Sequence, residues 1–323
     1  MRRLVVVAAP ALGLAATAVA SAACEDAPSD RLERWRPKWK PRLEDSAASW
    51  HIGRVAHPAV VAFGGDLLEG APPRARVLVP LCGAAHDVAH FAWQGHDVVA
   101  VEGVPAALEA FKAEYAQPPS ERTLADRVAD WWAGRRARAD AGELDPKAKA
   151  ATRVVRLRAE RGGARARVTW LEADFLELPP GAAATANATV DAAFDRGGLV
   201  AVEPADRARY AATLARLVKP GGRVLLVATE HAPFAGGRLG PPFSVEAAEV
   251  ERIFAGAFEI APLKREDRLP VEPVWVERGC SYFFEATYLL TRRAPTVATS
   301  PPEGGDEALD EVDPRCLGTI MSS

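Results

Sequence analysis

Apolar and polar positions alternate in short blocks along the middle of the chain, and these blocks predict a series of strands and helices. A β-branched run ends at Pro80 and Gly83, and a segment with helical composition follows from about Ala85. A second apolar run, 97–102, ends in the acid Glu102, nineteen residues after Gly83. This order of strand, turn, helix and strand predicts the first βαβ unit of a doubly wound sheet.

The same alternation continues along the rest of the chain. Helices are expected over 55–68, 105–115, 204–217 and 245–255, with Ser244 as the N-cap of the last one. Strands are expected over 168–175, 190–198 with its turn, 223–230, 258–263 and 281–291. We therefore expect an α/β fold with a doubly wound, seven-stranded, mostly parallel sheet, whose last two strands form an antiparallel pair at one edge.

Three segments depart from this pattern. In residues 1–24, two arginines precede an apolar run and then small residues, which predicts a signal-like or transit-like targeting segment that is too short for a membrane span. Residues 117–167 are basic and poor in β-branched residues, and we expect an inserted helical segment there. Residues 294–323 have the composition of a disordered tail. The main domain then spans 25–293.

Composition and charge exclude several classes of protein. The 323 residues carry a formal net charge of −3, so no basic field indicates nucleic-acid binding. The four cysteines are far apart and match no zinc pattern or disulfide framework. We expect Cys82 and Cys280 to be small buried apolar residues, and we expect no metal.

The turn after the first predicted strand indicates which nucleoside could bind. A pyrophosphate favours a G-x-G-x-x-G turn, whereas residues 80–86 hold a single glycine. One glycine is sufficient for S-adenosylmethionine, which has no phosphate. Glu102 would then bind the ribose hydroxyls, while Asp174 and Phe175 would contact the edge and the face of the adenine. Alternatively, Glu102 and Asp174 are solvated acids at strand ends.

An aromatic series precedes the first predicted strand. Trp35 and Trp39 are four residues apart, so on a helix they share one face, and Trp50 follows. Two interpretations remain open. The indoles pack a helix on the main domain, or they form a flap over a ligand.

Several motifs together resemble the thiopurine S-methyltransferase family, a group of Rossmann-like methyltransferases that use S-adenosylmethionine. The resemblance extends from about Leu32 to Arg293, apart from the inserted segment. It is carried by the motifs at 79–83, 95–102, 195–201, 240–243 and 288–291.

The resemblance implies a role for each matching position. It places tryptophans and the turns after the strands around the cofactor, and an aromatic–histidine pair at both cofactor and substrate. It also implies an arginine where cofactor and substrate meet. The matching residues are Trp35, Trp39, Trp50, His51, Leu81, Gly83, Glu102, Asp174, Phe175 and Arg196. Three departures stand out: Ala84 replaces the usual Lys or Ser, residues 117–167 are atypical, and a second substrate-side arginine has only Arg268 and Arg278 as neighbours.

The reaction implied is in-line methyl transfer from S-adenosylmethionine to a small-molecule thiol of thiopurine or aromatic type. We assign Arg196 to steadying the substrate through its fixed donor fork, and Asp195 to holding that arginine or a backbone turn. One alternative is a thiol or halide methyltransferase, or one acting on selenium or tellurium compounds. More distant alternatives are a nicotinamide-dependent oxidoreductase, which the single-glycine turn argues against, and a non-catalytic binding module.

The donor also constrains localisation and partners. S-adenosylmethionine is made inside cells, so we expect the catalytic domain to reside in the cytoplasm or an organelle where the donor is present. Residues 1–24 would supply an address or a possible membrane association. We expect a monomer that binds no nucleic acid.

Overall fold

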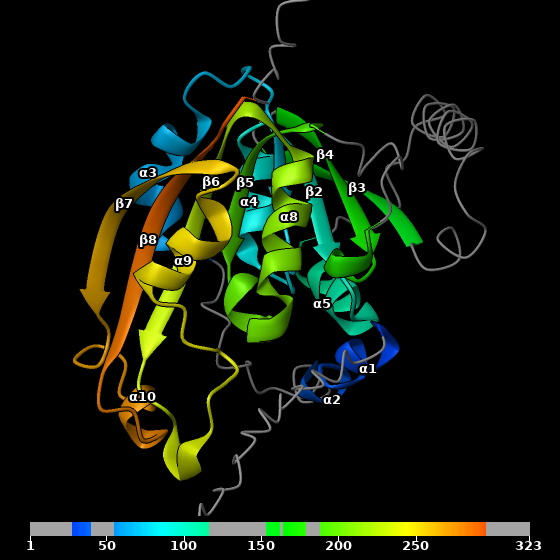
Figure 1. Ribbon diagram of the computed structural model, residues 1–323. Coiled ribbons are helices and arrows are strands. Elements are labelled where there is room, and N and C mark those ends of the chain that lie inside the picture. Colours follow the sequence, from blue (N-terminus) through cyan, green and yellow to red (C-terminus); the bar gives the residue numbers. More distant parts are fainter. Residues whose placement is uncertain (1–27, 40–54, 116–152, 162–163, 179–187, 295–323) are drawn as a thin grey trace, which may run out of the picture. The chain divides into compact units, whose positions relative to one another are not determined.

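An eight-stranded sheet forms the centre of the protein. The computed structural model describes it, with its helices, over residues 28–39, 55–115, 153–161, 164–178 and 188–294 (Figure 1). The strand order is β3-β4-β2-β1-β5-β6-β8-β7. The strands are β1 Arg76–Val79, β2 Asp97–Glu102, β3 Arg153–Arg161, β4 Ala164–Glu172, β5 Val190–Arg196, β6 Val218–His231, β7 Phe258–Asp267 and β8 Phe283–Arg292.

The described α-helices connect and cover these strands. They are α1 Pro28–Glu33, α2 Arg36–Trp39, α3 Pro58–Leu68, α4 His86–Trp93, α5 Pro105–Tyr115, α8 Arg207–Leu217, α9 Ala247–Phe254 and α10 Val274–Glu277. Short 3₁₀ turns are η4 Phe175–Glu177, η5 Leu199–Ala201, η6 Pro204–Asp206 and η7 Ala235–Gly237. None of the described helices is long and apolar enough to span a membrane.

The centre of the sheet is parallel and its edges are antiparallel. Strands β4, β2, β1, β5 and β6 pair in parallel, with Val79 opposite Ala100 in the β1–β2 pair. Strand β8 pairs antiparallel with both β6 and β7, which confirms the predicted antiparallel pair at one edge. Because the five parallel strands run in one direction, their carboxyl ends meet at the same edge of the sheet.

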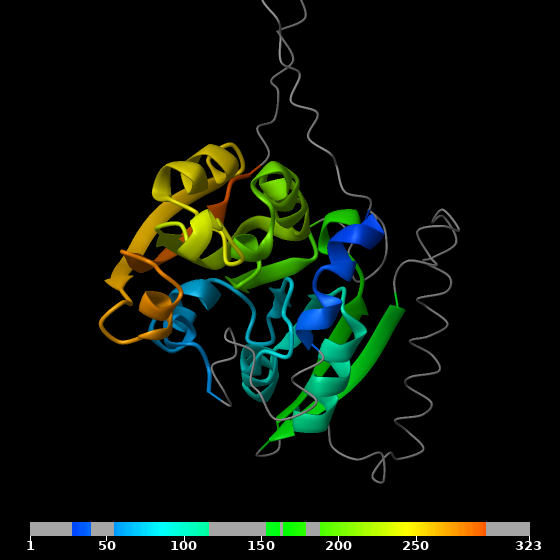
Figure 2. The same cartoon turned by 90° about the horizontal axis from the view of Figure 1, so that it is seen from below.

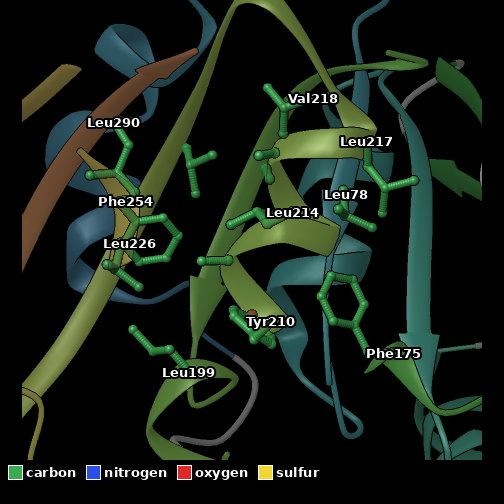
Figure 3. Packing of buried hydrophobic residues seen from close by; sticks show 14 of the residues in the cluster. Leu78, Phe175, Leu199, Tyr210, Leu214, Leu217, Val218, Leu226, Phe254 and Leu290 are labelled. Atoms are coloured by element: carbon green, nitrogen blue, oxygen red, sulfur yellow. The ribbon is translucent and has the colours of Figure 1, made fainter. Parts of the chain in front are cut away.

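Side-chain alternation along each strand builds a separate core on each face. On one face Leu78 and Leu226 pack with Tyr210 and Leu214 of α8 and with α9, as Figure 3 shows. On the other face the neighbouring strand residues pack with α3, α4 and α5. The helix predicted over 204–217 is present as η6 and α8, and the apolar side chains of α8 are buried against the sheet.

The structure differs from the sequence predictions in three places. The sheet has eight strands rather than seven, because β3 lies inside the segment predicted to be an inserted helix and pairs antiparallel with β4. Strand β6 begins at Val218 rather than at the predicted 223. Ser244 does not cap α9: Glu246 is its N-cap, and the Ser244 hydroxyl accepts the backbone N–H of His231.

Several predictions concern residues outside the described part of the chain. The targeting segment 1–24, residues 117–152 of the predicted insertion, and the tail from 295 belong to it. Residues up to Arg293 form one structural unit, and Ala294 begins a second.

Candidate active site

The carboxylate of Glu102 joins the turns that follow two neighbouring parallel strands. Its Oε2 accepts the backbone N–H of Gly83 after β1, at 3.0 Å, and its Oε1 accepts the N–H of Val104 after β2, at 2.8 Å. The side chain is held at the carboxyl edge of the sheet and only 9% of the residue is exposed. The structure therefore brings together Glu102 and Gly83, the two positions on which the sequence argument for a nucleoside site depends.

The turn after β1 has an unusual backbone. Leu81 and Gly83 both have positive φ, at 43° and 54°, a region that residues with a Cβ adopt rarely. A Cβ on Gly83 would lie 3.2 Å from the indole of Trp39. The glycine is needed here for its conformation and for the close approach of an aromatic ring.

The charge state of this turn follows from its burial. Burial raises the pKa of Glu102, although the N–H groups of Val104 and Gly83 oppose the rise. Burial, with the nearby charge of Glu102, also raises the pKa of the Cys82 thiol well above its ordinary value, so this thiol stays neutral. Each carboxylate oxygen of Glu102 accepts a backbone N–H and can accept a further hydrogen bond, and a ribose diol supplies two O–H donors. The residues present thus fit an adenosyl group.

Helices α1 and α2 lie across these turns. Trp39, only 3% exposed, packs on Gly83, and Leu32 lies so close to Gly103 that a Cβ there would overlap it. Trp35 packs at the edge of the same core, with Lys38 Nζ 4.1 Å from its ring centroid. Figure 2 shows the two helices across this end of the sheet. Both indoles pack on the domain, as one of the two interpretations predicted, and Trp39 lies directly over the candidate cofactor turn.

The two residues predicted for the adenine have partners within the protein. Asp174 Oδ1 accepts the N–H of Leu176 at 2.9 Å and caps η4, while its Oδ2 lies 3.2 Å from Arg31 of α1. Phe175 is buried and its ring packs 4.9 Å from that of Tyr210. Both lie at the carboxyl edge beside β2, and their role toward adenine stays a prediction.

Asp195, at the end of β5, organises the turn that follows it. Its Oδ1 accepts the N–H groups of Gly198 and Leu199 at 3.1 and 3.2 Å, and its Oδ2 accepts the Tyr210 hydroxyl at 2.8 Å. Burial raises its pKa to about 6. The prediction that Asp195 holds a backbone turn is confirmed.

Arg196 follows on the opposite face of the sheet, because side chains alternate along a strand. Burial lowers the pKa of its guanidinium, and the charges of Glu285, Asp87 and Glu272 oppose that shift. These acids come from β8, α4 and the segment before α10, far apart in the chain. Arg196 therefore lies at the carboxyl edge, next to β1, in acidic surroundings.

Arg268 and Arg278, the two arginines near the expected second substrate-side position, make different contacts. Arg268 donates to Glu272 Oε1, and its positive charge helps to lower the pKa of Arg196. Arg278 instead donates to the carbonyl of Pro241 at 3.2 Å. It thus helps to hold the Gly-Pro-Pro loop, whose Phe243 N–H binds the carbonyl of Val200 at 2.7 Å.

Sequence reasoning missed His57. It precedes α3, its backbone N–H binds Asp87, and its ring lies 3.5 Å from Glu285. A proline at the first position of α3 was the available signal, because it marks the preceding residue as a helix cap. Trp50 and His51 lie outside the described residues, so their roles stay predictions.

Comparison with known proteins places the chain in a defined group. The sequence profile of the family described as Thiopurine S-methyltransferase (TPMT) matches residues 32–137 and 139–293. The thiopurine S-methyltransferase of Pseudomonas paraeruginosa is 34% identical over 254 residues, which cover 79% of this chain and 97% of that protein. The enzyme of that name from Bordetella petrii is 31% identical over 262 residues, covering 81% and 97%. These relatives give no support to the oxidoreductase alternative.

Solved structures of other methyltransferases are similar to this chain at lower sequence identity. The structure of Burkholderia thailandensis 1,6-didemethyltoxoflavin-N1-methyltransferase, with bound S-adenosylhomocysteine, has a TM-score of 0.45 and 21% identity, covering 83% of this chain and 91% of that one. A SAM-dependent methyltransferase from Anabaena variabilis has a TM-score of 0.48 and 14% identity, covering 81% and 94%.

Proposed function

Because the chain belongs to the thiopurine S-methyltransferase family, we propose that its acceptor is a small aromatic or heterocyclic thiol, which it methylates on sulfur. The protein is an S-adenosylmethionine-dependent methyltransferase. The observation that carries the proposal is the Glu102–Gly83 hydrogen bond, which ties together the turns after β2 and β1. Arg196 stands at the end of β5, the next strand beyond β1 in the sheet.

The residues divide into two groups with different tasks. Glu102 would hold the ribose diol and the Gly83 turn would lie against the methionine part, with Trp39 excluding water from that turn. When bound, S-adenosylmethionine supplies a methyl group attached to a sulfonium sulfur. The acceptor sulfur bonds to the methyl carbon, and the electrons of the broken carbon–sulfur bond stay on the departing sulfur. The main task left to the protein is alignment, for which proximity and orientation can contribute ~7–11 kcal/mol.

Arg196 would steady the acceptor thiolate or a polar group beside it. Aromatic thiols ionise readily near neutral pH, so their proton can pass to solvent before transfer and a dedicated base is not required. Asp195 is unsuited to that task, because it is 0% exposed and is occupied by Tyr210 and the turn N–H groups.

The first experiment tests the cofactor assignment. Replacing Glu102 with Ala removes a carboxylate that would accept two hydroxyl groups, and we expect S-adenosylmethionine to bind ~10–100-fold more weakly by calorimetry. The matched control is Glu172→Ala, because Glu172 is the register partner of Glu102 at the end of β4. If both variants lose S-adenosylmethionine affinity equally, the loss reflects the change in net charge and the ribose assignment is refuted.

The second experiment tests the acceptor. Purified protein is incubated with labelled S-adenosylmethionine and a panel of benzenethiol, heterocyclic thiols, iodide and selenide, with headspace analysis for volatile methyl products. We expect methylated aromatic thiols, and Arg196→Ala should raise the acceptor KM at least about tenfold. Methyl iodide or methylated selenium as the sole product would replace the thiol proposal. Full thiol methylation by Arg196→Ala would refute the role of Arg196.

We further propose that the protein acts as a monomer where S-adenosylmethionine is present, directed there by residues 1–24. N-terminal sequencing of the mature protein from its native cells should show cleavage near the end of that segment, and an intact Met1 would contradict it. Light scattering of the purified protein should give the mass of one chain.

A further inference from the structure

His57 holds two carboxylates that face Arg196. Its backbone N–H donates to Asp87 Oδ1 at 2.8 Å, and its ring Nε2 lies 3.5 Å from Glu285 Oε2. The other ring nitrogen, Nδ1, accepts the N–H of Ala59 at 3.2 Å and so caps α3. With 3% of the residue exposed, all three contacts are sheltered from solvent.

These contacts define the state of the His57–Glu285 pair. Since Nδ1 accepts a hydrogen bond, the proton of a neutral ring is assigned to Nε2, which faces Glu285. Burial opposes ionisation of Glu285, but the hydrogen bond from His57 and the charges of Arg196 and Arg268 keep its pKa below the ordinary value. The carboxylate is therefore ionised near neutral pH and held on the α3 side.

Strand register brings this carboxylate to the Arg196 side of the sheet. Arg196 is opposite Val227 of β6, and Glu285 is opposite Thr229, two residues further along β6. Positions two apart on a strand share a face, so Arg196, Thr229 and Glu285 lie on the same face. The Thr229 hydroxyl is buried there and has no hydrogen-bond partner within the described part of the chain.

We propose that His57 is a positioning residue, which keeps Glu285 on the α3 side so that this carboxylate does not pair with Arg196 in place of the acceptor. The inference rests on the proposed function, in which Arg196 faces the acceptor sulfur. Without the ring, Glu285 is released on the face that it shares with Arg196, and an intramolecular carboxylate competes with an external thiolate for the same guanidinium.

The substitution His57→Asn separates this contact from the others. Asparagine is a good N-cap and retains the backbone N–H that binds Asp87, but its side chain is too short to reach Glu285. We expect the KM for benzenethiol to rise about tenfold with kcat within about twofold, and acceptor binding in the presence of S-adenosylhomocysteine, followed by tryptophan fluorescence, to weaken equally. Affinity for S-adenosylmethionine and the Tm should stay near those of the wild type.

The distinctive result is rescue. Glu285→Gln alone should leave KM at or below the wild-type value, because an amide does not compete for the guanidinium charge. The double variant His57→Asn/Glu285→Gln should return KM to within about threefold of the wild type. The matched control is His96→Asn, since His96 Nδ1 also accepts a backbone N–H, from Ala75 at 3.2 Å, but before β2 at the other end of that strand.

Each remaining outcome decides against one claim. If the KM of His57→Asn rises and Glu285→Gln does not restore it, His57 has only a structural role. If the KM of His57→Asn is unchanged, His57 does not position Glu285. A tenfold rise in KM for Glu285→Gln alone would mean that Glu285 supports Arg196 rather than competing for it. A wild-type protein that methylates no thiol would refute the proposed function, and this inference with it.

Discussion

Asp195 is a buried group whose ionisation is expected to cost stability. Burial raises its pKa from an ordinary 3.8 to about 6, although hydrogen bonds from Tyr210, Leu199 and Gly198 oppose the rise. Because the folded-state pKa lies above the unfolded one, the folded chain binds this proton more tightly. The stabilisation is complete below about pH 4 and is lost as the pH rises through about 6. The difference of about two pKa units corresponds to about 3 kcal/mol at most.

The perturbation that isolates this effect is Asp195→Asn. The amide oxygen can still accept the N–H groups of Gly198 and Leu199, and the amide N–H₂ can donate to the Tyr210 oxygen, so the geometry is preserved. Urea unfolding of both proteins, followed by tryptophan fluorescence at about pH 4.5 and about pH 7.5, measures the free energy of unfolding. Between these values the variant should gain about 2 kcal/mol relative to the wild type, because part of the full effect is already lost at about pH 4.5.

A second carboxylate gives a control of opposite sign. Partial burial opposes the shift at Asp97, but hydrogen bonds from Arg167 and Arg74 lower its pKa. Its stabilisation is present above the unfolded pKa of 3.8 and is lost as the pH falls below it, so the wild type should gain over Asp97→Asn as the pH rises to about 4.5, by under about 1 kcal/mol, and change little above that. A free-energy difference between wild type and Asp195→Asn that does not change with pH would refute the reasoning on Asp195.

Two further predictions concern the turns beneath the N-terminal helices. Gly83→Ala should cost about 1–2 kcal/mol of stability and weaken S-adenosylmethionine binding about tenfold, because the new Cβ meets Trp39 at 3.2 Å with φ at +54°. Gly70→Ala, at φ +76° with nothing within 4 Å, carries the backbone strain alone and should bind the cofactor normally; equal losses in binding would contradict the argument. Arg31→Ala removes the ion pair with Asp174, in which both side chains are 12% exposed, and should cost about 1–3 kcal/mol locally. Hydrogen exchange in α1 measures that loss, and unchanged protection would rule it out.

The sequence was sufficient to predict the parallel centre of the sheet, because its strands are largely apolar runs and turn or helix residues separate them along the chain. It was not sufficient for β3. The segment 117–167 is basic on average, and this average hid the alternation in which Val155 and Leu157 pack on the core. In β6, the strand was predicted from 223, but pairing of Val218 with Val190 begins it earlier.

The candidate site shows the same division between local and distant signals. Glu102 and Gly83 were predicted because a strand, a turn and a strand-end acid are visible within one short stretch. The contacts of His57 with Glu285 and of Arg31 with Asp174 join distant parts of the chain, and nothing near either residue indicates its partner. Asp195 was an intermediate case: the sequence left two partners open, and burial against Tyr210 decided for the turn.

The contact between Trp39 and Gly83 has a consequence for sequence variation in this protein. An indole edge lies 3.2 Å from the place where a Cβ would stand, so the two positions occupy one shared volume. A side chain at 83 requires the indole at 39 to move by a few tenths of an ångström or to be replaced by a smaller ring, so substitutions at the two positions should occur together.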